Sequence, residues 1–179
     1  MVNLIYGIIG CLHILTYMVF RRIDNRIDMD LATYNKGRIG IKVFVDTLKR
    51  NEYRNVFYFR IPLFLRLLLN LFLRRVPDCK LQCARVGGGG INVHHGWGTI
   101  VLAERIGERF SVYQNVTVGY GKDGKPTIGD DVSIYSGAVV FGGIKIGNHV
   151  RIAANTVVRT NIPDYSLVYG NPAVIVSQK

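Results

Sequence analysis

The chain has 179 residues, of which 49% are hydrophobic, and its formal net charge is +11. This length suits one domain with an appendage and is enough to bury a sizeable core. Residues 1–85 contain 15 Lys and Arg against 6 Asp and Glu, whereas residues 86–179 contain 8 against 6. Because the basic residues stand among long apolar runs and no nucleic-acid motif is present, we expect contact with a lipid surface and no nucleic-acid partner.

The cysteines are few and odd in number: Cys11, Cys79 and Cys83. A disulfide framework needs pairs, and a structural zinc site needs a second cysteine or histidine pair at suitable spacing. We therefore expect a reducing compartment and no metal.

The first twenty residues contain no Asp, Glu, Lys or Arg, and Arg21 and Arg22 follow directly. A bilayer span requires roughly 20 residues. The segment lacks the positive start and the cleavage site of a signal peptide. Three arrangements stay open: a spanning helix, a helix in the membrane interface, and a helix packed against the protein. If the segment spans, the arginine pair places the rest in the cytoplasm. We expect a cytoplasmic protein at the inner face of the cytoplasmic membrane.

Two further helices are predicted in this first part. Residues 41–51 place four apolar side chains on one helical face. Pro62 suits the first turn of a helix over residues 63–73, which is nearly all apolar and is followed by Arg74 and Arg75. That helix either lies on a membrane, with its arginines reaching the phosphates, or packs at a subunit contact.

A six-residue period begins beyond the glycine run at residues 87–90. Hexapeptide periods indicate a parallel β-helix, in which three hexads make a coil and stacked coils share an aliphatic core. We therefore predict a mainly β fold: a β-helix domain over residues 81–179, preceded by an α-helical N-terminal region over residues 1–80. The period has one ten-residue step, and its aliphatic residues are Ile100, Ile106, Val112, Val118, Ile128, Ile134, Val140, Ile146, Ile152 and Val158.

Two features of this repeat point to chemistry. Residues 120–127 interrupt it with a Gly- and Pro-containing loop, and in solenoids such insertions gather on the binding face. His94 and His95 stand in a glycine-flanked turn about one coil earlier. An imidazole with a pKa near 6.5 takes a proton from a hydroxyl at neutral pH, so a histidine here is a candidate general base.

Residues from about 80 to 176 resemble the serine acetyltransferase-like hexapeptide acyltransferases. The shared motifs are HGWGTIV, SVYQNVTVG, PTIGDDVSIYSGAVVFGGIKIGNHVRIAANTVV and the terminal IPDYSLVYGNPAVIV. This resemblance implies a left-handed helix and a homotrimer with active sites in the grooves between subunits. It also implies acetyl-CoA as the co-substrate, lying along the groove.

The resemblance also suggests residue roles. The family's catalytic histidine matches His95, which would deprotonate the acceptor hydroxyl for direct attack on the thioester. Glu104 stands about where the family has a glutamate. The positions that match CoA contacts are Gly119, Tyr120, Gly121, Ser136, Arg151, Ala153 and Ala154. The candidate acceptor-binding residues are His94, Trp97, Lys125 and Asp30. Asp30 suits a helix cap equally well, and Arg151 a solvated face.

Three departures from the family pattern affect the acceptor. The family's Asp before the histidine is replaced by His94, a second acidic residue falls on Lys80, and the pair that binds the serine carboxylate falls on Gly124 and Lys125. The HG-aromatic-GT motif is also similar to the capsule and exopolysaccharide branch.

We therefore predict an acetyl-CoA-dependent O-acetyltransferase that acts on a sugar hydroxyl of a surface polysaccharide precursor. The alternative is a serine O-acetyltransferase of cysteine biosynthesis, with Lys125 binding the serine carboxylate. Two other classes stay open: a carbonic anhydrase-like metal site using His94, His95 and His149, and a β-helix without acyl transfer.

Overall fold

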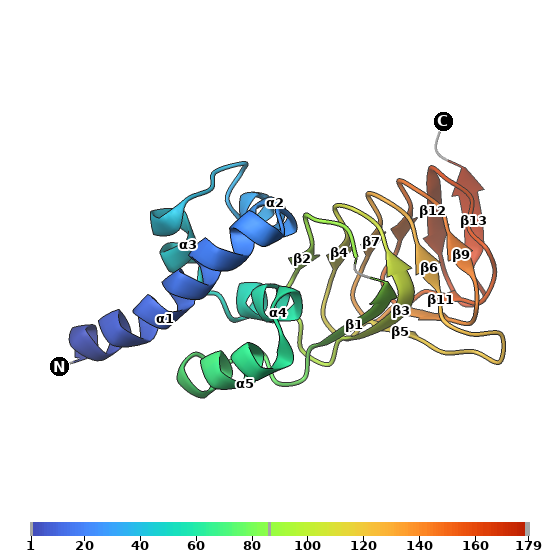
Figure 1. Cartoon of the computed structure of the whole chain (residues 1–179). Coiled ribbons are helices and arrows are strands. Elements are labelled where there is room, and N and C mark those ends of the chain that lie inside the picture. The colour runs from blue at the N-terminus through green and yellow to red at the C-terminus, as the bar shows by residue number, and fades with distance from the viewer. Residues whose placement is uncertain (1, 86, 178–179) are drawn as a thin grey trace.

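The computed structural model describes the backbone of residues 2–85 and 87–177 and the side chains of residues 10–85 and 87–176. Helices form the first part of the chain and short strands the second (Figure 1). The helices are α1 (Val2–Ile23), α2 (Arg26–Tyr34), α3 (Ile41–Thr47), α4 (Asn51–Arg60) and α5 (Leu63–Phe72). The strands are β1 (Lys80–Arg85), β2 (Asn92–Val93), β3 (Ile100–Ile106), β4 (Ser111–Val112), β5 (Thr117–Gly119), β6 (Thr127–Ile128), β7 (Ser133–Ile134), β8 (Val139–Phe141), β9 (Lys145–Ile146), β10 (Arg151–Ile152), β11 (Val157–Val158), β12 (Ser166–Tyr169) and β13 (Val174–Ser177).

The helices share an aromatic core of their own. Phe44 of α3 stacks on Tyr17 of α1 at 4.2 Å between ring centroids, and it meets Phe57 of α4 edge-on at 5.0 Å. α3 ends at Thr47, so the helix predicted over residues 41–51 is shorter than expected. Arg50 is extended and precedes α4. The helix predicted after Pro62 is present as α5. We propose to divide the chain at residues 80 and 81, where β1 begins.

α1 packs on this core by one side. Tyr17 is fully buried, and His13 is buried with its Nε2 atom 2.9 Å from the hydroxyl of Tyr58. Among the helices described, none is both long enough and apolar enough to cross a bilayer. For residues 10–23 these contacts favour the third arrangement, a helix packed against the protein; the side chains of residues 1–9 lie outside the described part.

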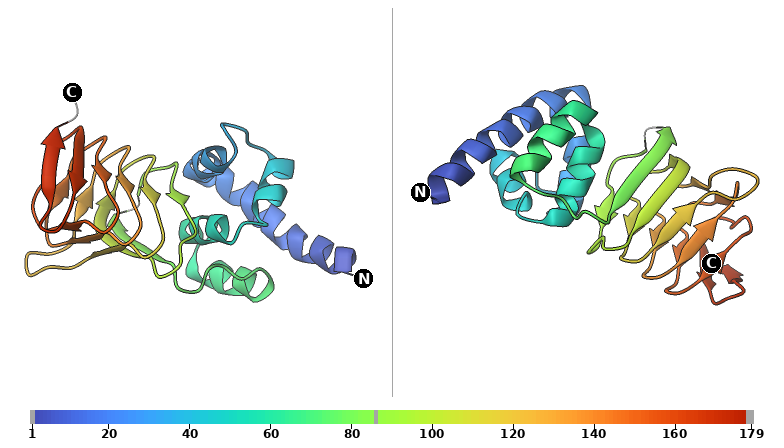
Figure 2. Two further views of the ribbon diagram at one scale, coloured as in Figure 1. Left: turned by 180° about the vertical axis from the view of Figure 1, so that it is seen from behind. Right: turned by 90° about the horizontal axis from the view of Figure 1, so that it is seen from below.

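The strands wind into a parallel β-helix with three faces (Figures 1 and 2). The first face contains β2, β4, β7, β10 and β12. The second contains the start of β3 with β5, β8 and β11, and the third contains the end of β3 with β6 and β9. β1 pairs with β3 in parallel, and β13 closes the other end by pairing with β12 in antiparallel. The predicted mainly β solenoid is confirmed.

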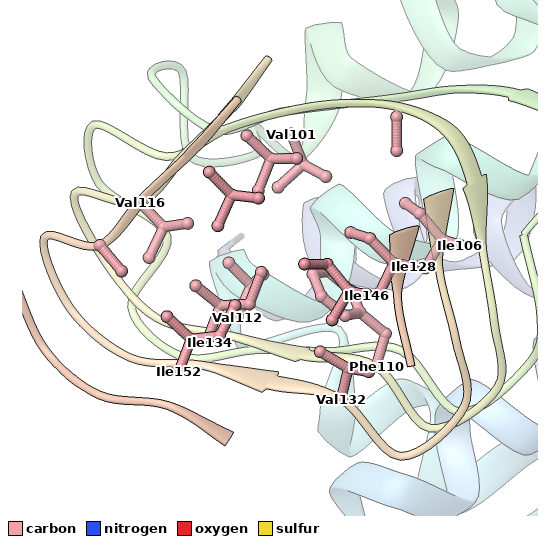
Figure 3. Close-up of a cluster of buried hydrophobic side chains, with 14 of the residues drawn as sticks. Val101, Ile106, Phe110, Val112, Val116, Ile128, Val132, Ile134, Ile146 and Ile152 are labelled. Carbon is pink, nitrogen blue, oxygen red and sulfur yellow. The ribbon is translucent and has the colours of Figure 1, made fainter. Parts of the chain in front are cut away.

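The hexad residues form the core of this solenoid (Figure 3). Nine of the ten predicted inward residues are at most 1% exposed. Ile100 is the exception, because it is 40% exposed while Val101 is fully buried. The inward position of β3 is therefore Val101, one residue later than predicted.

The steps between inward residues explain this error. On the later coils, Ile134 and Val140 are six residues apart across the corner between the first and second faces, and both are fully buried. On the first coil the equivalent step runs from Val93 to Val101, which is eight residues. The corner at residues 94–98 therefore holds two additional residues.

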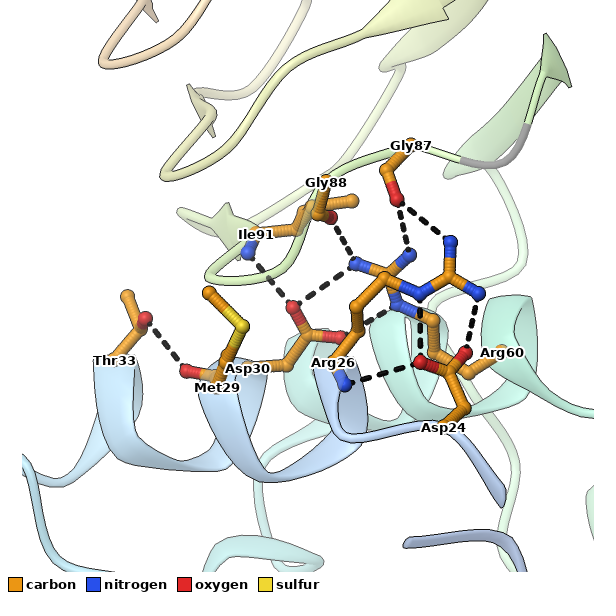
Figure 4. A network of polar contacts seen from close by, with 9 residues as sticks. All are labelled: Asp24, Arg26, Met29, Asp30, Thr33, Arg60, Gly87, Gly88 and Ile91. Atoms are coloured by element: carbon orange, nitrogen blue, oxygen red, sulfur yellow. Dashed lines mark hydrogen bonds and ion pairs between the residues drawn. The ribbon is translucent and has the colours of Figure 1, made fainter.

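A buried ion pair joins the helices to the first coil (Figure 4). The side chains of Arg60 and Asp30 are 1% and 2% exposed, and Nε and Oδ2 are 2.7 Å apart. Arg60 also donates to the carbonyl groups of Gly87 and Gly88, and the N–H of Ile91 donates to Asp30. A Cβ atom at Gly88 would come within 2.5 Å of the backbone of the next coil, so only glycine permits this approach.

We expect Asp30→Asn to lower the free energy of unfolding by about 3–5 kcal/mol, because it leaves the guanidinium of Arg60 buried without a countercharge. Asp46→Asn is the matched control, since Asp46 pairs with Lys49 at the surface and such pairs contribute about 0–1 kcal/mol. Urea unfolding measures both. Equal losses in the two variants would show that the buried pair does not stabilise the junction.

Candidate active site

His95 projects from the corner that holds the two additional residues. It is exposed and has a φ of 64°, in the left-handed region that histidine adopts more readily than most residues. Its ring stacks near that of Trp97, with 6.0 Å between centroids, and Trp97 is 63% exposed. The insertion therefore lifts an imidazole and an indole away from the regular surface of the solenoid.

The helical region is connected to this corner through Asn55 and Cys79. The side chain of Asn55 donates to the carbonyl groups of Val76 and Cys79. Gly96 lies directly over Cys79, and a Cβ atom there would come within 3.3 Å of the Cys79 sulfur. Burial raises the pKa of the Cys79 thiol to about 11, so it is a neutral packing group. The position of His95 therefore depends on α4.

His94 has a different environment from His95. Its ring stacks on Tyr113 of the next coil at 4.1 Å, and its Nε2 atom is 2.9 Å from the amide of Asn92. Burial, and to a smaller extent the neighbouring His95, lower the pKa of His94 below its ordinary value. His94 is thus an oriented ring whose charged form is disfavoured, and His95 is the more exposed of the two imidazoles.

A cleft of about 260 Å³ lies between the helices and this corner. Sequence reasoning missed its two charged residues, Arg50 and Glu52, which stand at the start of α4. Arg50 is exposed and Glu52 half-buried, and neither forms an ion pair with another described residue. The other lining residues are Thr33, Tyr34, Asn92, Val93, His94 and His95. The cleft therefore places a guanidinium and a carboxylate beside the imidazole of His95.

The predicted CoA-binding residues fall on two different corners. Ser136 and Ala154 lie on the corner of His95, one coil and two coils beyond Gln114, as their backbone hydrogen bonds show. Ala153 precedes Ala154 there, and Arg151 is exposed on β10 of the adjoining face. Gln114 was missed by sequence reasoning, and its buried Oε1 atom has no partner among the described residues. Small side chains and an unpaired amide oxygen therefore follow His95 along one edge.

The remaining predicted CoA residues lie at the insertion loop. Gly121 and Gly124 form an antiparallel bridge in it, and Lys125 lies 5.1 Å from the ring centroid of Tyr120. Gly119 ends β5, so the loop leaves the corner between the second and third faces. Within one chain it is on a different corner from His95. One copy therefore does not bring Lys125 and His95 together.

Two other predicted site residues lie away from the cleft. The carboxylate of Asp30 is enclosed by Arg60 and Ile91, so it is out of reach of an acceptor, and we replace its predicted binding role with a structural one. Glu104 is on β3, where its carboxylate is 3.6 Å from Arg85. It does not line the cleft with His95 within one chain.

The histidines do not gather into a metal site in the part of the chain that is described. No group of three or more His, Cys, Asp or Glu side chains there is placed to hold a metal ion. His149 stacks on Tyr165 and lies 3.5 Å from Asp131, far along the chain from His94 and His95. This arrangement gives no support to a carbonic anhydrase-like site.

Comparison with known proteins adds the class of chemistry. A family model described as bacterial transferase hexapeptide (six repeats) matches residues 125–160. The serine acetyltransferase of Staphylococcus aureus (strain Mu50 / ATCC 700699) is 46% identical over 97 residues, which cover 51% of this chain and 45% of that protein. The chain thus spans about half the length of the curated relatives it matches.

Solved structures share the fold over most of the chain. The crystal structure of serine acetyltransferase from Brucella abortus strain S19 covers 92% of this chain and 73% of its own, with a TM-score of 0.67 and 20% identity. A serine acetyltransferase in complex with CoA covers 87% of this chain and 72% of its own, with a TM-score of 0.58 and 22% identity. These likenesses support the helical region and the β-helix together as one architecture.

These findings contradict the predicted sugar acceptor, because the relatives and structures that match are serine acetyltransferases. The predicted capsule and exopolysaccharide branch has no support among them. The error came from treating the missing Asp and Arg-His pair as a missing serine pocket. The structure shows that Arg50 and Glu52, from a distant part of the sequence, supply charges beside His95.

We expect NMR titration to show His94 with a pKa below that of an ordinary histidine, as its burial requires. Since a protonated neighbour disfavours a second positive charge, His95→Gln should raise the pKa of His94. An unchanged His94 titration in that variant would show that the two rings do not interact.

Proposed function

We propose that the protein is an acetyl-CoA-dependent serine O-acetyltransferase with His95 as its general base. The observation that carries this proposal is the cleft in which His95 stands beside Arg50 and Glu52. The 46% identity of the β-helix part to a serine acetyltransferase supports the same reaction.

The reaction requires a general base that accepts the proton of the acceptor hydroxyl and later donates it to the leaving thiolate. His95 takes the proton of the serine hydroxyl while the oxygen attacks the thioester carbonyl of acetyl-CoA. The tetrahedral intermediate collapses, the carbon–sulfur bond breaks, and the CoA thiolate receives the proton from the imidazolium of His95. The products are O-acetylserine and CoA. The edge with Gln114, Ser136 and Ala154 has small side chains suited to the pantetheine arm, and the unpaired oxygen of Gln114 suits one of its amide N–H groups.

Arg50 and Glu52 suit the two charges of an amino acid. A guanidinium binds a carboxylate in a planar, bidentate manner, and a carboxylate accepts hydrogen bonds from an ammonium group. We propose that Arg50 holds the α-carboxylate of serine and that Glu52 holds its α-ammonium. This pair takes the place of the family's Arg-His pair, at whose positions this chain has Gly124 and Lys125.

We also propose a homotrimer. Within one chain, the loop with Tyr120 and Lys125 lies at a different corner of the solenoid from the turn with His95. Packing three solenoids side by side brings the loop of one copy to the His95 corner of the next. The site would then draw on two subunits, and Glu104 and Lys125 would act from the neighbouring copy. Acetyl-CoA as co-substrate and three free cysteines fit a cytoplasmic location.

We expect His95→Ala to reduce kcat/KM for acetyl transfer to serine by about 10²–10⁴-fold, the usual contribution of a general base. His149→Ala is the control, because its ring is also exposed but lies against Tyr165 outside the cleft. Release of CoA thiol measures both rates. A wild-type rate in His95→Ala would exclude His95 as the base, and transfer to sugar acceptors without transfer to serine would exclude the proposed acceptor.

We expect Arg50→Ala and Glu52→Gln each to raise KM for serine by about 10–100-fold, as the loss of one charged hydrogen bond predicts, while KM for acetyl-CoA stays within about twofold. Lys49→Ala is the matched control, since Lys49 adjoins Arg50 and pairs with Asp46 at the surface. Unchanged KM for serine in both cleft variants would contradict the zwitterion site even if His95 is confirmed as the base.

A further inference from the structure

α5 exposes an apolar face that nothing in the described chain covers. Leu69 is fully buried, and Leu65 and Leu73 pack partly against the helical core. The opposite half of the helix faces outward and is wholly apolar. Its residues are Leu63, Phe64, Leu67, Leu68, Leu71 and Phe72, with exposed fractions of 64%, 68%, 61%, 40%, 76% and 47%. Monomeric soluble proteins rarely leave such a contiguous patch open, so the face indicates a partner.

The segment that contains α5 is basic. Residues 53–77 contain five arginines and no Asp or Glu. Arg54 donates to the carbonyl of Arg74, and Arg60 is paired with Asp30. The other three, Arg66, Arg74 and Arg75, form no ion pair with any residue the structure describes.

The positive charges of two of these arginines oppose each other. Burial lowers the pKa of Arg66 first, and the charge of Arg75 lowers it further. The Nε atom of Arg66 is buried without a hydrogen-bond partner. These arginines beside α5 therefore have no ion-pair partner among the described residues. A partner that carries negative charge would provide one.

We propose that the outward face of α5 docks on an anionic lipid bilayer. The apolar half of the helix would lie among the acyl chains near the interface, and Arg66, Arg74 and Arg75 would reach the lipid phosphates. A second copy of the chain fits less well. This holds for a two-fold contact, in which the same face of both copies meets: it would bring two sets of unpaired arginines together, which costs free energy, whereas an anionic surface neutralises them.

This mode of contact does not need a spanning helix. An α-helix of ten residues is about 15 Å long, half the thickness of a hydrocarbon core, so α5 suits the interface. No residue of α5 lines the cleft with His95. The proposal is thus independent of acetyl transfer, and loss of either one leaves the other testable.

The test is flotation of the full-length protein with vesicles of phosphatidylcholine alone and with roughly one third phosphatidylglycerol. We expect binding to the anionic vesicles and little to the neutral ones. The double variant Leu67→Glu/Leu71→Glu should lose at least tenfold in vesicle affinity. Arg74→Gln should lose roughly fivefold, because each basic residue near an anionic surface contributes about that factor.

Two controls keep the outcomes separate. Val174→Glu/Val176→Glu adds the same charges at similarly exposed apolar positions on β13, far from α5, and should bind like the wild type (Figure 1). An unchanged circular dichroism spectrum and an unchanged urea unfolding midpoint show that each variant is folded. If the wild type does not bind anionic vesicles, or if Leu67→Glu/Leu71→Glu instead changes the oligomeric state measured by light scattering, the face binds protein and the proposal is wrong.

Discussion

The buried pair of Arg60 and Asp30 is the interaction on which the arrangement of this molecule depends. It connects α2 and α4 to the glycine run that leads into the first coil. Two ions taken out of water stabilise a fold only when their remaining hydrogen-bonding groups are satisfied, and here backbone groups of Gly87, Gly88 and Ile91 satisfy them. The pair therefore fixes where the helices sit relative to β2, and with that the distance between Arg50 and His95.

The corner that carries His95 gains its shape from an irregularity in a regular scaffold. The solenoid core takes its aliphatic residues at fixed positions of each hexad, so additional residues have to be placed at a corner. At residues 94–98 two additional residues lengthen the turn, and His95 projects from it next to Gly96. The strands before and after this turn keep their register. A rigid core and a displaced turn together give an exposed imidazole with a fixed position.

The β-helix could be predicted from the sequence because the aliphatic residues of the core recur at a fixed spacing of six. It misplaced Ile100 because the corner before it is two residues longer than the period. It did not reveal Arg50 and Glu52, which are separated from His95 by more than forty residues and meet it only through the packing of α4. It also led to the wrong acceptor, because residues absent from a motif were taken to argue against a serine enzyme, whereas the matching relatives are serine acetyltransferases. Resemblance alone suggested the roles of Ser136 and Ala154, and the stacking of coils then placed them on the edge of His95.

The first face of the solenoid is covered at both ends, and this limits how copies of the chain can meet. Parallel coils present open strand edges that invite further coils to stack and grow into fibres. At one end α2 and α4 pack against β2, and at the other end β13 runs opposite to β12, so a new coil finds no matching edge. On this face, addition of a further parallel coil is thus blocked at both ends. The covered ends of this face therefore oppose the growth of the β-helix into a longer fibre.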